Sequence, residues 1–218
     1  MSLSLIIFDL DGTLVDSSAD ICGALNYALT PYGLSEVSIE ETISLVGEGA
    51  TALVGKVIRQ KAPGLDLPVV MKRFLEHYSA HMTDASAPYP GVVEALERLS
   101  SFRKAVVSNK LEAFSIQLLQ SLGLLKYFNY VSGGDTSSEK KPSPIPIIEV
   151  LSRFDALPRD ALFVGDSIYD MRAAKAAGLR AVAVLYGYGP PGFSEEADYT
   201  IDRIGDLVDI VTRLAVPP

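Results

Sequence analysis

The chain begins with a short apolar run that leads directly into acidic residues. Leu5 to Phe8 are consecutive apolar residues, a pattern typical of a strand that is buried on both faces in a parallel sheet. Asp9 follows at once, and Asp11 and Thr13 come at steps of two residues after it. Because alternate side chains of an extended chain lie on the same side, we expect these three side chains to face one space.

The pattern then changes to the spacing of helices. Apolar residues recur at helical intervals after Ser17, and Ser17 or Ser18 can cap the first helix. Four helices are predicted, over about 18–29, 38–46, 50–61 and 68–81. Because no convincing strand interrupts them, we expect residues 16–84 to form a separate α-helical domain, called here the helical insertion.

Beyond a turn-rich segment at 88–91, helices and strands alternate. Strands are predicted over 104–107, 130–132, 161–164, 181–185 and 199–201, and helices over 92–99, 111–122, 144–154, 167–177 and 204–214. Strands separated by helices indicate an α/β fold with a parallel sheet. Residues 1–15 and 85–218 would then form one discontinuous domain. The helical insertion joins it close to the acidic motif, so it is placed to open and close over a ligand.

Composition disfavours several classes of function. The chain has 218 residues, of which 48% are hydrophobic, enough to bury a core, and its formal net charge is −8. This acidity argues against nucleic acid as a partner, because proteins that bind it are usually basic. No apolar run approaches the ~20 residues that a membrane span needs, so we expect no membrane partner. With one cysteine, Cys22, and no signal-peptide pattern, a cytoplasmic protein is expected.

The closely spaced carboxylates of Asp9 and Asp11 need a partner. Two crowded carboxylates repel each other unless a cation or a proton holds them. Mg2+, a hard cation that prefers oxygen ligands, is the simplest candidate. The competing interpretation is a β-hairpin, since Asp-Gly between two apolar runs is a strong turn signal. Taken alone, this stretch supports both interpretations about equally.

Three later segments place phosphate- or metal-binding groups at strand ends or helix starts, where ligands bind in open α/β sheets. Ser108 and Asn109 follow a strand and can bind phosphate oxygens, although Ser108 could equally cap the next helix. Lys141 precedes a helix and can neutralise a phosphoryl group, although a solvated turn also explains it. Asp166 and Asp170 can bind a metal or simply stabilise the start of their helix. All of these groups together, in this order, favour a ligand site.

These residues also carry a resemblance to a known family. The segment Asp9-Leu10-Asp11-Gly12-Thr13, with Ser108, Lys141 and the segment Gly165-Asp166 to Asp170, resembles the four signature motifs of the haloacid dehalogenase superfamily. The resemblance covers nearly the whole chain. It implies a Rossmann-like doubly wound parallel sheet core with an inserted α-helical cap domain. Within the superfamily, the chain looks most like the phosphoglycolate phosphatases, on the segments 46–49, 108–110, 133–136 and 141–144.

The resemblance implies a chemical role for the acidic residues. Asp9 would attack phosphorus and form an aspartyl-phosphate. Asp11 would protonate the leaving oxygen and later take a proton from the hydrolytic water. A Mg2+ ion would be held by Asp9, Asp166, Asp170 and the backbone carbonyl of Asp11, and it would let an anionic nucleophile approach an anionic phosphate.

The resemblance also implies which residues hold the substrate. Ser108 and Lys141 would bind the phosphoryl oxygens, and Thr13 would orient the loop that carries the nucleophile. Further substrate contacts are expected from Asn109, Lys110 and the loop Gly47-Glu48-Gly49 of the helical insertion. The chain is therefore predicted to be a Mg2+-dependent phosphatase, acting as a monomer or homodimer on a small phosphorylated metabolite. The expected substrate is 2-phosphoglycolate.

Other functions stay open at this point. A sugar phosphomutase of the same superfamily would use the same aspartyl-phosphate, although the helical insertion lacks the Arg-Gly signature of those mutases. A pyrophosphatase or nucleotidase would share the core and differ only in the insertion, whereas a dehalogenase should lack the acid at Asp11. From a different class, the chain could be a non-catalytic module that binds a phosphometabolite. A dinucleotide-dependent oxidoreductase is disfavoured, because no Gly-x-Gly-x-x-Gly follows the first strand.

Overall fold

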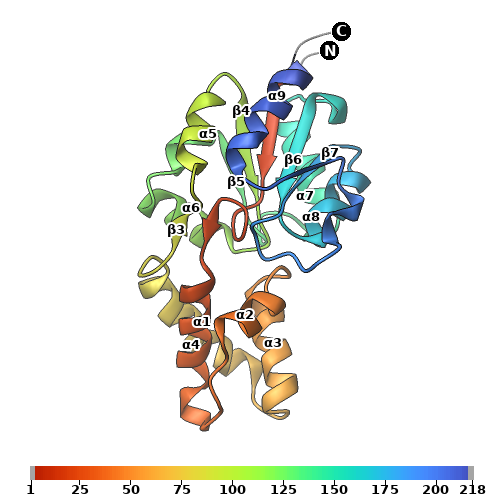
Figure 1. Ribbon diagram of the computed structural model, residues 1–218. Coiled ribbons are helices and arrows are strands. Elements are labelled where there is room, and N and C mark those ends of the chain that lie inside the picture. The colour runs from red at the N-terminus through yellow and green to blue at the C-terminus, as the bar shows by residue number, and fades with distance from the viewer. Residues whose placement is uncertain (1–2, 216–218) are drawn as a thin grey trace.

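The protein is built around a six-stranded parallel sheet (Figure 1). A computed structural model describes residues 3–215. The strands lie in the order β5-β4-β1-β6-β7-β8, and every neighbouring pair is parallel. Their bounds are β1 (Leu5–Phe8), β4 (Arg103–Val107), β5 (Tyr130–Ser132), β6 (Ala161–Gly165), β7 (Arg180–Val184) and β8 (Tyr199–Ile201). The predicted α/β fold with a parallel sheet is confirmed, and the buried strand β1 lies in its interior.

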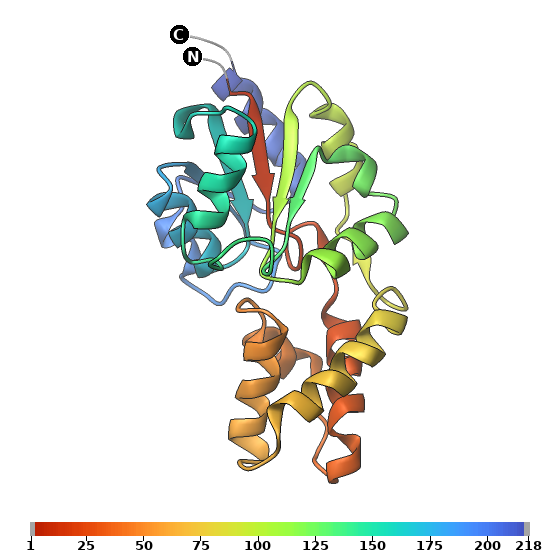
Figure 2. The same cartoon turned by 180° about the vertical axis from the view of Figure 1, so that it is seen from behind.

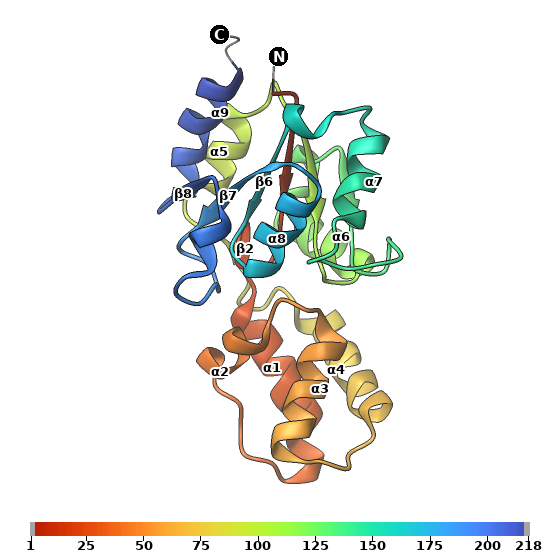
Figure 3. The same ribbon diagram turned by 90° about the vertical axis from the view of Figure 1, so that its right-hand side faces the viewer.

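Helices cover both faces of this sheet (Figures 2 and 3). They are α5 (Val92–Arg98), α6 (Glu112–Ser121), α7 (Ile145–Arg153), α8 (Ile168–Ala176) and α9 (Leu207–Ala215). One hydrophobic cluster joins Ile6 and Phe8 to residues of α5, α6 and α9. A second cluster joins Leu5 and Ile7 to residues of α7 and α8. Alternate residues of β1 therefore pack on opposite faces, as the pleat of a strand requires.

The helical insertion lies beyond the carboxyl ends of the strands (Figure 1). Its helices are α1 (Ser18–Leu29), α2 (Ile39–Leu45), α3 (Ala50–Lys61) and α4 (Leu67–His81). Helix α4 packs against both α1 and α3. Ser38 accepts a hydrogen bond from the N–H of Glu41 at 3.1 Å, so α2 begins at the cap that the sequence predicts. The helices predicted for the insertion are all present.

Two short antiparallel strands join the insertion to the sheet. Strand β2 (Val15–Asp16) pairs with β3 (Ala87–Pro88). Beside them, the buried carboxylate of Asp20 accepts hydrogen bonds from the N–H groups of Ala85 and Ser86, which holds the returning chain against α1. The sequence pattern does not predict these strands, because two residues are too few to show a period. The predicted domain boundaries themselves stay a prediction.

The Asp-Gly turn after β1 does not close a hairpin. Strand β1 pairs with β4 and β6 instead. Gly12 has φ of +85°, a conformation that favours glycine, in a loop that leads into β2. The hairpin interpretation is therefore wrong. Short 3-10 helices complete the chain, at Thr30–Tyr32, Leu125–Tyr127, Pro158–Asp160, Phe193–Glu196 and Ile204–Asp206, the last of which precedes the closing helix α9.

Candidate active site

Three largely buried carboxylates meet at the carboxyl edge of the sheet and are called here the acid cluster. Asp9 follows β1, Asp166 follows β6, and Asp170 lies in the first turn of α8. One oxygen of each lies within 4.8 Å of the others. The N–H of Asp9 still donates to the carbonyl of Val164 in β6 at 2.9 Å, so the sheet itself holds Asp9 beside the end of β6. The structure thus brings together three residues that the sequence predicts as metal ligands.

The start of α8 fixes Asp170. The hydroxyl and the N–H of Ser167 donate to Oδ2 of Asp170 at 2.6 and 3.0 Å, and the N–H of Asp170 donates back to the Ser167 hydroxyl. This reciprocal pair is a capping box. A Cβ at Gly165 would lie 2.5 Å from Cβ of Asp170, so only glycine allows this close approach. Asp170 therefore stabilises the helix start and faces the acid cluster at the same time.

Lys141 lies inside the acid cluster rather than in a solvated turn. Its Nζ atom lies 2.8 Å from Oδ1 of Asp9 and 2.6 Å from Oδ1 of Asp170, and the residue is 3% exposed. The side-chain amide of Asn109 fixes its backbone, accepting from the Lys141 N–H at 3.0 Å and donating to the Lys141 carbonyl at 2.9 Å. The solvated-turn interpretation is therefore wrong.

Lys141 can neutralise only one of the three carboxylates of the acid cluster. With all three ionised, the net charge of the cluster and Lys141 would be −3 + 1 = −2. Burial, followed by the charge of Asp170, raises the pKa of Asp9 to about 7. Burial and the neighbouring carboxylates also raise the pKa of Asp166. A divalent cation would relieve this repulsion, and the all-oxygen donor set fits Mg2+.

Polar contacts from two loops hold Asp166. The Thr13 hydroxyl donates to its Oδ1 atom at 2.8 Å, and the N–H of Tyr188 donates to its Oδ2 atom at 2.8 Å. Tyr186 donates its hydroxyl to the carbonyl of Thr13 at 2.8 Å. Thr13 therefore orients a carboxylate of the acid cluster, and its side chain does not line the cavity described below.

Sequence reasoning misses Tyr186 and Tyr188, which follow β7 in a segment without periodicity. The one signal is the glycine between them. A Cβ at Gly187 would lie 2.3 Å from Cβ of Asp166. Such a glycine marks a close approach of two loops, but nothing in the sequence says which loop is the partner.

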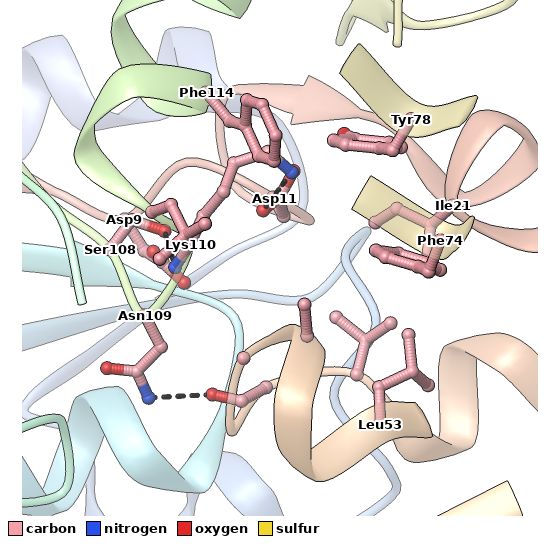
Figure 4. Close-up of a pocket in the computed structure, with 15 residues that line it drawn as sticks. Asp9, Asp11, Ile21, Leu53, Phe74, Tyr78, Ser108, Asn109, Lys110 and Phe114 are labelled. Atoms are coloured by element: carbon pink, nitrogen blue, oxygen red, sulfur yellow. Dashed lines mark hydrogen bonds and ion pairs between the residues drawn. The ribbon is translucent and has the colours of Figure 1, made fainter. Parts of the chain in front are cut away.

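The side chain of Asp11 is held apart from the acid cluster. Lys110 Nζ lies 3.0 Å from both of its oxygens, and the hydroxyl of Ser17 donates to Oδ1 at 2.5 Å. Figure 4 shows this ion pair at the side of the site that faces the helical insertion. The two acids of the first motif thus have different surroundings, because Asp9 belongs to the acid cluster and Asp11 pairs with Lys110.

A cavity of about 70 Å3 lies between the sheet edge and the helical insertion (Figure 4). One water needs ~10–15 Å3 by this measure, so the cavity has room for a small ligand. The polar part of its wall includes Asp9, Asp11, Ser108, Asn109 and Lys110. The rest is mostly apolar or aromatic, formed by Ile21, Val46, Ala50, Leu53, Phe74, Tyr78, Leu111 and Phe114.

Ser108 and Asn109 have different positions in this wall. Ser108 is buried and lines the cavity. It does not cap the following helix, because α6 begins at Glu112 and Leu111 occupies the cap position, so the capping interpretation is wrong. The side chain of Asn109 donates to the carbonyl of Gly47 at 2.8 Å. Together with its bonds to Lys141, this contact makes Asn109 a link between the acid cluster and the helical insertion.

The loop Gly47-Glu48-Gly49 contacts the sheet domain. Gly47 and Gly49 line the cavity, and a Cβ at Gly49, where φ is +87°, would lie 2.7 Å from the carbonyl oxygen of Asn109. The Glu48 side chain instead accepts a hydrogen bond from the Tyr169 hydroxyl and pairs with Lys56 at 3.0 Å. Glu48 therefore ties the insertion to α8 and does not line the cavity.

Comparison with known proteins assigns the family. The family model for haloacid dehalogenase-like hydrolases matches residues 6–184. The chain belongs to this family. The phosphoglycolate phosphatase of Aquifex aeolicus (strain VF5) is 40% identical over 211 residues, which are 96% of this chain and 97% of the relative. That of Agrobacterium fabrum (strain C58 / ATCC 33970) is 37% identical, with 93% of this chain and 90% of the relative covered.

Solved structures agree with this assignment. A predicted phosphoglycolate phosphatase from Haemophilus somnus 129pt superposes with a TM-score of 0.92 at 31% identity, covering 96% of this chain and 98% of the other. CbbY from Rhodobacter sphaeroides in complex with phosphate has a TM-score of 0.82 at 26% identity, covering 95% and 96%. The predicted enzyme class is confirmed: this haloacid dehalogenase-like hydrolase is a phosphatase-type enzyme, a phosphoric monoester hydrolase. Within residues 3–215, no helix is both long and apolar enough to cross a membrane.

Proposed function

We propose that the protein is a Mg2+-dependent phosphatase that hydrolyses 2-phosphoglycolate through an aspartyl-phosphate on Asp9. The observation that carries this proposal is the position of Asp9. Its carboxylate belongs to the acid cluster, contacts the buried Lys141 and also lines the cavity. The substrate is inferred from the names of the relatives, and the small size of the cavity is consistent with it.

The residues around Asp9 fit a Mg2+ ion. Asp9, Asp166 and Asp170 supply oxygen ligands, and Thr13 and the Tyr188 N–H hold Asp166 in place. When bound, Mg2+ supplies positive charge that offsets the phosphate and lets a carboxylate approach it. Hydrogen bonds that orient a metal ligand in this way contribute to metal affinity, because they hold the ligand in its binding position.

In the first chemical step, an oxygen of Asp9 attacks phosphorus. A new bond forms between that oxygen and phosphorus, and the bond from phosphorus to the glycolate oxygen breaks. Asp11, in its protonated form, gives its proton to the departing oxygen. Lys141 and Ser108 bind the phosphoryl oxygens, and Lys141 neutralises charge that builds up on them.

In the second step, a water attacks the phosphorus of the aspartyl-phosphate. Asp11, now ionised, accepts a proton from this water, and the bond from phosphorus to the Asp9 oxygen breaks. Phosphate leaves, and Asp11 is again protonated for the next turnover. Strong charge neutralisation is required because spontaneous hydrolysis of phosphate monoesters is extremely slow, and enzymes accelerate it by up to ~10^21-fold.

The test is phosphate release from a panel of substrates in the presence of Mg2+. The panel contains 2-phosphoglycolate, sugar phosphates, nucleotides and pyrophosphate, with Asp9→Asn as the blank. The proposal predicts the highest kcat/KM for 2-phosphoglycolate. A higher value for another phosphate would overturn the substrate while leaving the mechanism. Isomerisation of a sugar phosphate without phosphate release would establish a mutase instead. The cytoplasmic location and the monomeric or homodimeric state stay predictions.

A further inference from the structure

Tyr78 presents an unusual polar group to the cavity. The residue lies on α4 of the helical insertion, is 2% exposed and lines the cavity (Figure 4). Its hydroxyl is buried and makes no hydrogen bond of ordinary geometry with the described residues, although the ammonium group of Lys110 lies close enough to interact with it. Buried hydroxyl groups are nearly always hydrogen-bonded, because an unpaired one loses its bonds to water. The hydroxyl is therefore available to a ligand that enters the cavity.

Lys110 places a positive charge beside this hydroxyl. Its Nζ atom lies 4.7 Å from the centre of the Tyr78 ring and 3.0 Å from each carboxylate oxygen of Asp11. Among the described residues that line the cavity, Lys110 is the one with a cationic side chain. Of the other nearby cations, Lys141 is enclosed by the acid cluster, and Lys140, whose Nζ atom would lie 3.3 Å from a Cβ at Gly49, does not line the cavity. A second anionic group on the substrate would therefore find its partner at Lys110.

We propose that Lys110 and Tyr78 form the subsite that binds the carboxylate of the substrate. This inference rests on the proposed function, because it needs the phosphoryl group at Asp9. In 2-phosphoglycolate, only an oxygen and a methylene separate the phosphorus from the carboxylate carbon. Because this distance is short, the carboxylate of a substrate whose phosphoryl group lies at Asp9 would lie near Asp11. The Nζ atom of Lys110 is at the same place, since it pairs with Asp11. Lys110 supplies the charge, and the Tyr78 hydroxyl donates the hydrogen bond.

The apolar part of the cavity explains why larger substrates would be rejected. Phe74 and Leu53 of the insertion and Phe114 of α6 line the cavity near this subsite. The hydroxyl groups of a sugar phosphate would be buried against these side chains without partners, and each unpaired hydroxyl costs free energy on binding. Because Tyr78 belongs to the insertion and Lys110 to the sheet domain, a bound carboxylate also bridges the two parts of the protein.

The experiment compares two substrates that differ only at the proposed contact. They are 2-phosphoglycolate and 2-hydroxyethyl phosphate, in which a neutral hydroxymethyl group replaces the carboxylate. The measured quantity is the ratio of their kcat/KM values in the wild type, Tyr78→Phe and Lys110→Met. We expect the ratio to fall roughly 10-fold in Tyr78→Phe and roughly 100-fold in Lys110→Met, as loss of hydrogen bonds to a charged group predicts. Using the ratio cancels any effect that acts through Asp11.

The matched control is a second lysine–tyrosine pair on the surface. Lys126 Nζ lies 4.9 Å from the ring centre of Tyr127, and neither residue lines the cavity. Lys126→Met and Tyr127→Phe should leave the ratio unchanged. If Lys110→Met does not fold, Tyr78→Phe, which keeps the ring, still tests the subsite.

Each outcome separates this inference from the proposed function. A wild type that hydrolyses 2-phosphoglycolate, with variants that lose activity on both substrates equally, overturns the subsite and leaves the phosphatase. A wild type that releases phosphate from neither substrate overturns the proposed function, and the subsite with it. Titration calorimetry of 2-phosphoglycolate with Asp9→Asn adds a reading without turnover. The affinity of the Asp9→Asn variant for 2-phosphoglycolate should fall when Tyr78→Phe is added to it. An unchanged affinity would contradict the subsite.

Discussion

The ammonium nitrogen of Lys141 lies 2.8 Å from Oδ1 of Asp9. The same nitrogen lies 2.6 Å from Oδ1 of Asp170, so one buried cation joins the loop before α7 to the end of β1 and to the start of α8. Removing it would leave buried carboxylates without a positive partner, which is far more costly than losing an exposed ion pair. The site is therefore also a determinant of stability.

Lys141→Met should destabilise the metal-free protein by about 3 kcal/mol, the lower end of the range for breaking a buried ion pair. Urea unfolding without Mg2+ measures this change. Mg2+ should restore more stability to this variant than to the wild type, because the cation replaces part of the missing charge. Lys126→Met, which removes a lysine outside the site, is the control. A loss no larger than in the control would show that the acid cluster is already neutral.

Mg2+ affinity should rise with pH up to about pH 7. The raised pKa of Asp9, about 7 instead of 3.8, means that the folded metal-free protein holds a proton that the unfolded chain releases. This contribution to stability is complete below about pH 4 and is lost as the pH rises through 7. Since Mg2+ binds the ionised carboxylate, it competes with that proton.

The dissociation constant for Mg2+ should therefore be about tenfold higher at pH 6 than at pH 8. Titration calorimetry in the two buffers measures it, and Asp166→Asn should abolish the heat of binding at both values. Equal affinities at the two pH values would mean that Asp9 is ionised throughout the range.

Thr13→Val should weaken Mg2+ binding without removing any ligand. The variant loses the 2.8 Å hydrogen bond to Oδ1 of Asp166 and keeps the shape of the side chain. Contacts of this kind, behind a metal ligand, typically change metal affinity by about 10- to 100-fold. Thr13→Ser, which keeps the hydroxyl, should bind Mg2+ nearly as the wild type does. If Thr13→Ser is as weak as Thr13→Val, the methyl group matters and the hydrogen bond does not.

Asp11→Asn should separate the two chemical steps. With 4-nitrophenyl phosphate, the leaving group needs little protonation, so the first step should survive while the second, which needs a base, slows by roughly 10^2- to 10^4-fold. Rapid mixing should then show a burst of nitrophenol close to one equivalent per enzyme, followed by slow turnover. A linear time course at the wild-type rate would assign the proton transfer to another group.

Much of this architecture is predictable from the sequence, because its apolar residues clearly follow the patterns of buried strands and of helices. The apolar run at Leu5–Phe8 indicates a buried strand, and the helices of the insertion appear, α2 with its predicted Ser38 cap. The predicted cap of α1 is wrong, because the Ser17 hydroxyl donates to Asp11 instead. The acids Asp9, Asp166 and Asp170 can be singled out because each lies at a strand end or a helix start. Their meeting point follows from the general rule that parallel strands end at one edge.

The rest depends on contacts between distant segments that no local pattern encodes. The order of the strands, the pairing of β2 with β3 and the contact of the Tyr186–Tyr188 loop with Asp166 are of this kind. Tyr78 follows the helical spacing of α4 like an ordinary core residue, and only the structure shows that it lines the cavity and buries its hydroxyl. The contacts of Glu48 with Tyr169 and Lys56 are likewise visible only in the structure.

The most direct test of the account is to trap the phosphorylated enzyme. Asp11→Asn is mixed with 4-nitrophenyl phosphate, whose leaving group needs little protonation, and with Mg2+, then quenched in acid within one turnover, digested and mapped by mass spectrometry. The account predicts a phosphate on the peptide that contains Asp9, and none when Asp9→Asn is added to the same variant. Phosphate release that proceeds with no labelled peptide, or a label on a peptide without Asp9, would contradict it.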